Sequence, residues 1–253
     1  MLSKVLSLYK KCGQTPLKCI NEFKNNDSGL SNLPMTYAGR LDPLAEGVLL
    51  VLIGDECHKK EEYLKLPKEY ELTILFGFST DTYDLMGKVV GPDHENWHGN
   101  FASKIQEILP KFTGKIKQKY PPYSSRTVGG KPLFVWAREG RLDEIEIPTH
   151  EVEVKSIDII KEGEITSEQL LEKIKNDISK VGGDFRQEDI INIWEKMLGN
   201  FPKENFPTRT LRISCGSGFY ARVLAYEIGQ AMGIQSLALD IVRTKVGEYT
   251  IRK

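Results

Sequence analysis

The sequence has few cysteines and no long hydrophobic run, and each absence removes a class of protein. It contains four cysteines, and no two are spaced as Cys-x-x-Cys, which argues against a zinc knuckle and a disulfide framework. No apolar run is long enough to cross a bilayer, and residues 1–11 lack the apolar core and cleavage site of a signal peptide. We therefore expect a cytoplasmic protein that has no membrane partner.

An excess of charge of one sign is also missing, because 35 Lys and Arg residues balance 35 Asp and Glu residues. A net charge of zero argues mildly against nucleic acid as a partner. Residues 111–141 differ, since Glu139 is their only acid. Their basic residues are Lys111, Lys115, Lys117, Lys119, Arg126, Lys131, Arg138 and Arg141, and their aromatic residues are Phe112, Tyr120, Tyr123, Phe134 and Trp136. Such a segment fits two interpretations equally: an RNA-binding surface, or a solvated basic face whose rings lie in the core.

Length and periodicity predict a large folded domain of the α+β class. A chain of 253 residues with 40% hydrophobic content can bury a sizeable core. Alternating or continuous apolar residues predict strands near residues 5–8, 48–53, 70–76, 152–159, 211–213, 237–246 and 249–251. Helical spacing predicts helices near residues 17–26, 55–64, 105–109, 132–138 and 223–232. Strands and helices do not alternate regularly, so we expect a mixed, largely antiparallel sheet flanked by helices.

Residues 161–207 have a different character from the rest of the chain. Apolar residues recur at helical spacing in residues 170–178 and again in residues 190–198, and Gly182 and Gly183 separate the two stretches. We expect a helical hairpin inserted on the surface of the domain. The sequence assigns no role to it.

The carboxylate of Asp42 stands in a short bend that leads into the apolar run of residues 48–53. Gly39 and Gly47 flank the bend and Pro43 follows Asp42, so the backbone is free to turn on either side and stiff at the charge. A charged residue on a rigid loop beside a core strand is well placed to serve catalysis. A simple turn residue is the alternative, and the residues alone favour it.

Four motifs along the chain change that balance. The first is Gly-x-Leu-Asp-Pro-Leu-Ala-x-Gly-Val-Leu at residues 39–49, and the second is Thr-Asp-Thr-x-Asp at residues 80–84. The third joins Tyr-Ser-Ser, Gly-Lys and Ala-Arg-Glu-Gly within residues 123–140, and the fourth is Gly-x-Tyr-x-Arg at residues 218–222. In sequence, order and rough spacing, these motifs resemble the TruB-type tRNA pseudouridine-55 synthases over almost the whole chain.

The resemblance implies the pseudouridine synthase fold with an RNA-binding cleft. It also implies an isomerase that converts uridine 55 in the T loop of tRNA to pseudouridine, without a cofactor. The reaction breaks the bond between uracil N1 and ribose C1′ and rejoins the base through C5, after the base has been flipped out. By position, Asp42 matches the family's nucleophile and Arg222 matches the arginine that pairs with it. Tyr70 matches an active-site tyrosine whose ring stacks on uracil and whose hydroxyl helps to move the ribose C2′ proton.

Further substrate contacts follow from the same resemblance. Tyr220 and Ile241 match residues that line the uracil pocket. Tyr37 stands where bacterial members usually carry a histidine that meets tRNA near the target base, and a tyrosine stacks but does not become cationic near neutral pH. Arg40 replaces a small residue and offers a phosphate contact. Lys10 is the lysine of the family's Lys-Pro pair and is expected among the substrate contacts.

The resemblance also suggests how the chain is organised. We expect residues 1–253 to form a single catalytic domain with the helical insertion at residues 161–207. Little chain follows Tyr249, so we do not expect the C-terminal RNA-binding PUA domain of many relatives. The expected partner is the T stem-loop of tRNA, and we expect a monomer that binds no metal.

Two other functions compete with this one. His94 and His98 fit the His-Glu-x-x-His pattern of zinc hydrolases, but that pattern needs a helix and a third ligand, and flanking glycines and a proline leave room for barely one turn. We expect a polar surface loop there instead. The other alternative is a non-catalytic RNA-binding or RNA-folding protein on the same scaffold. The presence of Asp42, Tyr70 and Arg222 argues against it.

Overall fold

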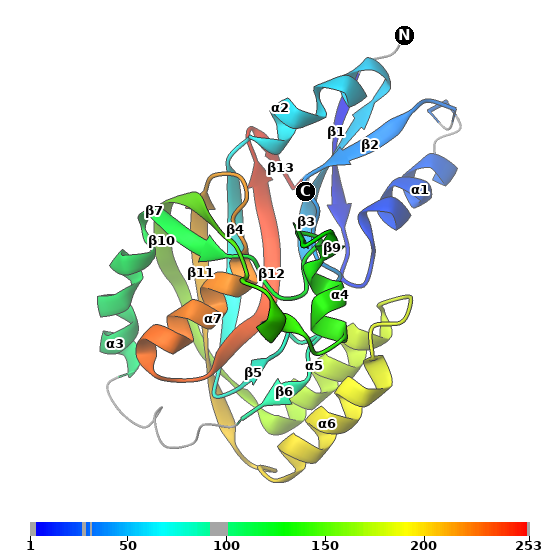
Figure 1. Cartoon of the computed structure of the whole chain (residues 1–253). Helices are drawn as coiled ribbons and strands as arrows, with labels where there is room; N and C mark the ends of the chain where they lie inside the picture. The colour runs from blue at the N-terminus through cyan, green and yellow to red at the C-terminus, as the bar shows by residue number, and fades with distance from the viewer. Residues whose placement is uncertain (1–3, 27–28, 31, 92–100, 252–253) are drawn as a thin grey trace.

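The structure is a computed structural model, and it describes residues 4–26, 29–30, 32–91 and 101–251. A mixed sheet runs through the molecule, and helices pack on its faces and ends (Figure 1). Its strands, in spatial order, are β1 (Lys4–Lys10), β3 (Glu46–Ile53), β12 (Ser236–Val246), β4 (Lys68–Phe76), β11 (Asn205–Cys215), β10 (Thr149–Thr166) and β7 (Gly114–Lys119). Strand β2 (Met35–Ala38) pairs with β3, and β13 (Tyr249–Thr250) pairs with β12. Only β3 and β12 pair in parallel among the described strands, so the predicted α+β fold with a mostly antiparallel sheet is confirmed.

The helices lie around this sheet. The α-helices are α1 (Pro16–Asn26), α2 (Lys60–Leu64), α3 (Phe101–Ile108), α4 (Leu133–Arg138), α5 (Ser167–Ser179), α6 (Gln187–Gly199) and α7 (Ala221–Met232). Short 3₁₀ helices are η1 (Gly54–Lys59), η2 (Leu109–Phe112) and η3 (Leu142–Glu144), and small hairpins are formed by β5 (Ser79–Thr80) with β6 (Val89–Val90) and by β8 (Thr127–Val128) with β9 (Lys131–Pro132). Figure 1 shows α1 and α2 beside the N-terminal strands, and α5 and α6 together at the opposite end of the molecule. No helix in the described ranges is long and apolar enough to cross a membrane.

Strand β3 is buried on both faces, as its unbroken apolar sequence predicts. Residues 48–53 are all 0% exposed. Leu49 and its alternate neighbours pack against Ile20 of α1, while Leu50 and its alternate neighbours pack against Val246 of β12. The loop that carries Asp42 therefore enters a strand that cannot shift without breaking two hydrophobic clusters.

Helix α7 covers the central strands. Leu72 and Ile213 on the sheet share one buried cluster with Leu224 and Ile228 of α7. The helix ends at Gly233, which has the left-handed φ of +70° expected for a C-terminal glycine. Because the apolar side of α7 is buried in this way, its N-terminus is fixed over this face of the sheet.

The predicted helical hairpin is present as α5 and α6, but the predicted bounds of residues 161–207 are wrong. Strand β10 continues to Thr166 and β11 begins at Asn205, so both ends of the segment are strands. Gly163 and Pro207 lie inside these strands and pair near one another. Both residue types are unfavourable in strands, and they concealed the extension in the sequence.

The hairpin lies at the surface, as predicted, and the apolar side of each of its helices packs inward. Leu170 and Ile174 of α5 and Trp194 of α6 are each 0% exposed. They share a buried cluster with Phe78 and Phe206, and the ring centroids of Phe78 and Trp194 lie 5.2 Å apart. The helices therefore form part of the core at the end of the sheet, beside the β5–β6 hairpin.

Candidate active site

Asp42 lies in the loop between β2 and β3, which turns so that the Ala45 N–H donates to the main-chain oxygen of Asp42 at 3.1 Å. Gly47 has a φ of +106°, and a Cβ there would collide with the main-chain oxygen of Arg243 on β12. Gly39 has a φ of +85° and lies against the guanidinium of the same arginine. Both glycines are therefore required by positive φ and by the close approach of β12.

Arg222 reaches Asp42 from the first turn of α7, although 180 positions separate them in the chain. Its Nε donates to Asp42 Oδ2 at 2.9 Å. The side chain of Arg222 is 4% exposed and that of Asp42 is 33% exposed. The pair thus joins a buried guanidinium to a carboxylate that is partly exposed to solvent.

The other nitrogens of Arg222 also have partners. Nη1 donates to the main-chain oxygen of Thr82 at 2.7 Å, and Nη2 donates to that of Tyr123 at 2.8 Å. Burial acts to lower the pKa of Arg222, but the charges of Asp42 and Asp84 outweigh it, and the pKa is raised. Arg222 is therefore a fixed cation that ties the Asp42 loop to two other loops.

Tyr70 and Ile241 lie on one face of the sheet beside this pair. They are 8% and 9% exposed. Ile241 on β12 pairs with Leu72 on β4, and Leu72 projects from the same face as Tyr70, two residues before it. Tyr220 precedes α7, and its main-chain N–H donates to the side-chain oxygen of Gln118 at 3.0 Å. These contacts place two tyrosines and one aliphatic side chain around the base of the site.

Electrostatic coupling supports this grouping. Burial raises the pKa of Tyr70 and of Tyr220, and the charge of Asp42 adds to both shifts. The packing agrees, because Leu41 beside Asp42 and Ala221 beside Arg222 lie in the same buried cluster as Tyr70 and Ile241. The structure therefore brings together the predicted site residues Asp42, Arg222, Tyr70, Tyr220 and Ile241.

Lys10 does not lie where a substrate contact was predicted. Its side chain is 0% exposed, and its Nζ donates to the main-chain oxygens of Ala45 at 2.6 Å and Pro43 at 3.1 Å. Burial lowers the pKa of Lys10 to about 8. The prediction of a substrate contact is wrong, because the ammonium holds the loop of Asp42 from inside the protein.

Arg243 is a second buried cation under the same loop, and the sequence analysis missed it. It is 1% exposed, and it donates from Nε to the oxygen of Val48 at 2.8 Å and from Nη2 to that of Gly39 at 2.9 Å. On the sheet it pairs with Tyr70. One signal was available, since Arg243 follows Ile241 by two residues in a strand and must share its inward face.

Tyr37 and Arg40 lie outside the central group. The Tyr37 ring packs against the cluster that includes Val51, and Lys60 Nζ lies 5.5 Å from its centroid. Arg40 is exposed, and its Nη1 donates to Ser125 Oγ at 3.2 Å. Both remain predicted contacts for RNA.

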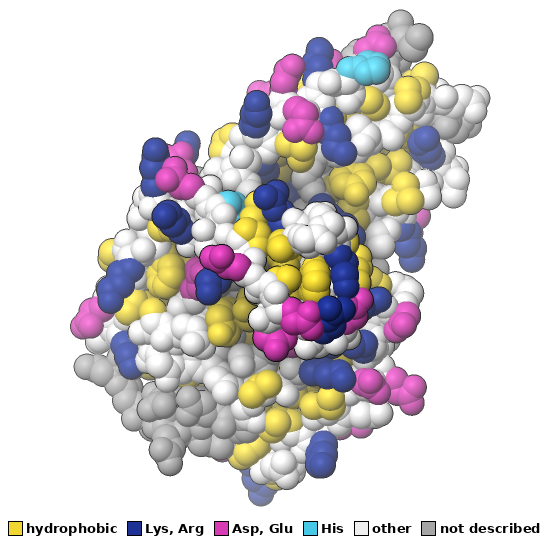
Figure 2. Space-filling model, viewed as in Figure 1, with side chains coloured by type: hydrophobic (Ala, Val, Ile, Leu, Met, Phe, Trp, Pro, Cys, Tyr) yellow, Lys and Arg dark blue, Asp and Glu magenta, His cyan; other side chains and the backbone are white. Residues whose placement is uncertain are grey.

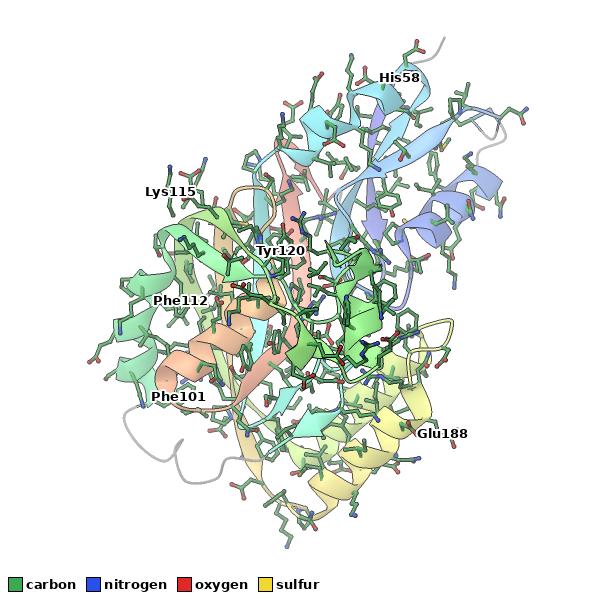
Figure 3. All side chains as sticks on the ribbon, in the orientation of Figure 1. His58, Phe101, Phe112, Lys115, Tyr120 and Glu188 are labelled. Carbon is green, nitrogen blue, oxygen red and sulfur yellow. The ribbon has the colours of Figure 1, made fainter. Side chains whose placement is uncertain are left out.

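The first half of the basic segment at residues 111–141 lies along β7. Lys115 and Lys117 are exposed and pair on the sheet with Glu153 and Glu151 of β10, and Lys115 Nζ lies 3.8 Å from a carboxylate oxygen of Glu151. Figure 3 shows Lys115 at the outer edge of the molecule. Glutamates from a distant part of the sequence thus balance the positive charge of the lysines on β7. This arrangement agrees with the interpretation of the first half as a solvated face.

The second half, residues 120–141, lies across the centre of the molecule and includes α4 (Figure 3). The guanidinium of Arg126 lies 5.0 Å from the ring centroid of Tyr120, and that ring stacks on His150 at 4.2 Å. The same ring lies 5.9 Å from that of Tyr220. Figure 2 shows hydrophobic side chains gathered over α4 and the β8–β9 hairpin, with charges of both signs around them. Cationic and aromatic groups together here suit an unpaired, phosphate-bearing ligand.

Metal binding finds no support in the part of the chain that is described. No group of three His, Cys, Asp or Glu side chains there could hold a metal ion. The His94 and His98 motif lies outside the described residues. All four cysteines are free thiols.

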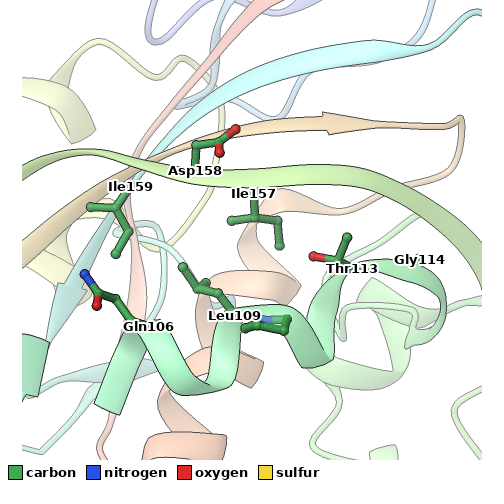
Figure 4. A pocket seen from close by; sticks show the side chains of 8 residues that line it. Gln106, Leu109, Thr113, Gly114, Ile157, Asp158 and Ile159 are labelled. Carbon is green, nitrogen blue, oxygen red and sulfur yellow. The ribbon is translucent and has the colours of Figure 1, made fainter. Parts of the chain in front are cut away.

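A shallow hollow lies between β10 and the α3–η2 segment (Figure 4). Gln106 and Leu109 line it from one side, and Ile157 and Ile159 line it from β10. No predicted site residue is among its lining residues. The hollow is therefore separate from the candidate active site.

Comparison with known proteins identifies the family. Residues 32–174 match the family described as TruB family pseudouridylate synthase, N-terminal domain. The chain is 30% identical over 246 residues to a tRNA pseudouridine synthase B from Nostoc sp., covering 97% of this chain and 68% of the relative. It is 28% identical over 218 residues to the enzyme of the same name from Aquifex aeolicus, covering 86% of this chain and 60% of the relative.

A solved structure has a similar fold. The Cbf5 chain in a crystal structure of a Cbf5–Nop10–Gar1 complex matches with a TM-score of 0.57 at 18% identity, covering 97% of this chain. This chain spans about half of that one, 49% of its length. The resemblance inferred from the four motifs is thereby confirmed, and the chain belongs to the TruB family of pseudouridylate synthases.

Proposed function

We propose that this chain isomerises uridine 55 in the T loop of tRNA to pseudouridine, with Asp42 as its nucleophile. One observation carries the proposal: a carboxylate that is 33% exposed is held at 2.9 Å by a guanidinium that is 4% exposed. Surface ion pairs usually expose both partners, so this asymmetry indicates a carboxylate kept available at a fixed position. The relatives named tRNA pseudouridine synthase B support the substrate class.

The protein holds Asp42 in place before substrate arrives. Arg222 binds one carboxylate oxygen and fixes the rotamer, while Lys10 and Arg243 bind main-chain oxygens on either side of the loop. A nucleophile held in this way loses little further freedom in the reaction. Asp42 attacks the ribose–uracil unit as the N1–C1′ bond breaks, and the freed base turns. The bond to Asp42 breaks again as C5 joins C1′, and the hydrogen of C5 leaves to water.

Tyr70, Tyr220 and Ile241 form the proposed surface for the flipped uracil. The two rings stack on or against the base, and the aliphatic side chain excludes water beside it. Burial raises the pKa of Tyr70, so its phenol keeps its proton at neutral pH. It accepts the ribose C2′ proton only after it has passed on its own proton.

The RNA around the target base is proposed to bind residues 120–141. Arg126 and Arg40 are exposed cations at this surface, and the Tyr120 ring offers a stacking face. We further propose that the T stem-loop is recognised by one copy of the chain, acting as a single catalytic domain in the cytoplasm. Analytical ultracentrifugation with and without tRNA tests the stoichiometry.

The test uses a tRNA transcript carrying tritium at C5 of its uridines. Isomerisation releases that tritium to water, because C5 becomes the atom bonded to ribose. We expect release of one equivalent from position 55, and no release from Asp42→Asn, which keeps the size of the side chain and removes its charge. The variant is expected to bind tRNA with an affinity close to that of the wild type. Equal release by both proteins excludes Asp42 as the nucleophile.

The same assay separates the proposal from an RNA-binding protein without activity. Such a protein would bind the transcript and release no tritium from it. A transcript with position 55 changed to cytidine is the matched RNA control, and it should bind but release nothing above background. Release from this control would place the target uridine elsewhere.

A further inference from the structure

The loop between α5 and α6 contacts the active-site loops through Arg186. Its Nη1 donates to Asp81 Oδ2 at 2.8 Å, and its Nη2 lies 3.4 Å from Asp81 Oδ1. The guanidinium carbon also lies 4.7 Å from the ring centroid of Tyr123. One arginine of the helical hairpin thus binds a carboxylate with two nitrogens and stacks on an aromatic ring.

Tyr123 continues this contact to the catalytic pair. Its hydroxyl donates to Asp81 Oδ2 at 3.0 Å, while its main-chain oxygen accepts from Arg222 Nη2 at 2.8 Å. Burial and the charge of Asp81 raise the pKa of Tyr123 to about 12, so the hydroxyl keeps its proton. Hydrogen bonds therefore run without a break from Arg186 through Asp81, Tyr123 and Arg222 to Asp42.

A second contact joins the same two parts of the chain. Arg138, the last residue of α4, donates from Nη2 to the main-chain oxygen of Asp184 at 3.0 Å. The α5–α6 loop thus holds residues 120–141 near their start, at Tyr123, and near their end, at Arg138. Because the apolar sides of both helices of the hairpin pack in the core, this loop is a firm support.

The backbone at Arg186 indicates that its position is specified. Arg186 has a φ of +64°, in the left-handed region that residues other than glycine and asparagine seldom adopt. It is the N-cap residue of α6, and its side chain makes no capping hydrogen bond. The side chain points instead to Asp81 and is 23% exposed, compared with 34% for Asp81.

We propose that Arg186 is a positioning residue for the reaction, which fixes Tyr123 and the 120–141 segment over Arg222 and Asp42 before tRNA binds. The inference rests on the proposed function for its kinetic part. Its physical basis is the geometry of the bound complex: without Arg186, Tyr123 and the guanidinium of Arg222 that it holds keep more freedom after substrate has bound, so Asp42 is less often in the productive position and kcat falls. Arg186 touches neither reacting atoms nor, in this proposal, the RNA.

The test compares Arg186→Asn with Lys196→Gln. Asparagine tolerates the left-handed backbone, so the variant removes the guanidinium without adding strain. Lys196 is an exposed cation of α6, and its change removes the same charge from the same hairpin. We expect kcat for tritium release to fall about tenfold in Arg186→Asn, with KM changed by less than about threefold, and no change in Lys196→Gln.

Amide hydrogen exchange of the free enzyme is the second measurement, and it requires no activity. We expect exchange across residues 120–141 to quicken in Arg186→Asn while the core strand β3 keeps its protection. A role limited to global stability would instead quicken exchange everywhere and lower kcat no further than the folded fraction. If the wild type releases no tritium, the proposed function fails, and the exchange measurement still decides the role of Arg186.

Tyr123→Phe supplies an independent variant, because it loses only the hydroxyl that binds Asp81. We expect a smaller loss of kcat, and the double variant with Arg186→Asn should lose no more than Arg186→Asn alone. Multiplying losses would show that the two residues act separately and would overturn the proposal. Three other results would overturn it as well. Arg186→Asn could keep the kcat and the exchange rates of the wild type, or it could change KM alone. The third result is a fall in kcat for Lys196→Gln that equals the fall for Arg186→Asn.

Discussion

Replacing Arg222 with lysine keeps a positive charge beside Asp42 and removes the geometry of the guanidinium. Arg222 donates to Asp42 and to the main-chain oxygens of Thr82 and Tyr123, at 2.9, 2.7 and 2.8 Å. A lysine ammonium at this position can bind Asp42 but cannot reach all three groups. A buried carbonyl left without a donor costs about 1–3 kcal/mol, and that of Tyr123 is only partly buried and costs less, so we expect the free energy of unfolding to fall by about 2–4 kcal/mol.

That loss is smaller than the total stability of a typical domain, so the variant should still fold. For a chain of this size it corresponds to a fall in Tm of about 5–15 °C. Activity should suffer more, because an ammonium that is not also held by the oxygens of Thr82 and Tyr123 binds the carboxylate of Asp42 without fixing its position. A misplacement of about 1 Å lowers a rate by roughly 100-fold, and we expect a single-turnover tritium-release rate reduced by that order.

The matched control is Arg212→Lys. Arg212 lies on β11, is 49% exposed and pairs with Glu71 at 3.3 Å, so the same chemical change occurs in an ion pair that faces solvent. We expect a Tm and a rate close to those of the wild type. A rate for Arg222→Lys that equals that of Arg212→Lys would refute the reasoning, because charge without geometry would then suffice.

Other predictions concern the supports of the site. Lys10→Met should lower Tm and the tritium-release rate together, because it removes the buried ammonium that donates to the main-chain oxygens of Ala45 and Pro43 in the Asp42 loop, whereas Lys11→Met at an exposed neighbour should change neither. Gly47→Ala should cost more than about 2 kcal/mol in urea unfolding, because it combines a collision with a positive φ, whereas Gly199→Ala, whose Cβ would meet open space, should be neutral or stabilising. Burial raises the pKa of Glu227 to about 7, so the native state holds a proton between about pH 4.5 and pH 7 that the unfolded state releases. Its contribution to stability therefore falls as pH rises through that window, and Glu227→Gln should remove this part of the pH dependence measured by chemical unfolding.

The sequence predicted the structure correctly wherever that structure depends on neighbouring residues. The apolar run of residues 48–53 predicted a buried strand, and the glycines beside Asp42 predicted a bend. Both outcomes depend on residues within a few positions of one another. The motif order also identified the family, because it samples several loops at once.

Local pattern failed where burial depends on a distant partner. Lys10 is charged and was expected to face substrate, but the main-chain oxygen of Pro43, 33 positions away, is one of the acceptors that bury it. Strand β10 extends to Thr166 because β11 pairs with it over its whole length, despite Gly163 and Pro207. Nothing within either stretch specifies those partners.

By itself the sequence determined where the loop of Asp42 begins and ends, which strand follows it and which family the chain resembles. The resemblance implied that Arg222 pairs with Asp42, and the tertiary structure brings the two together. Only the tertiary structure decided that two buried cations hold the loop and that Arg186 joins a helical hairpin to the same network. The reason is physical: turns and strand burial follow from neighbouring residues, whereas a contact across 180 positions exists only once the sheet has paired and α7 has packed on it.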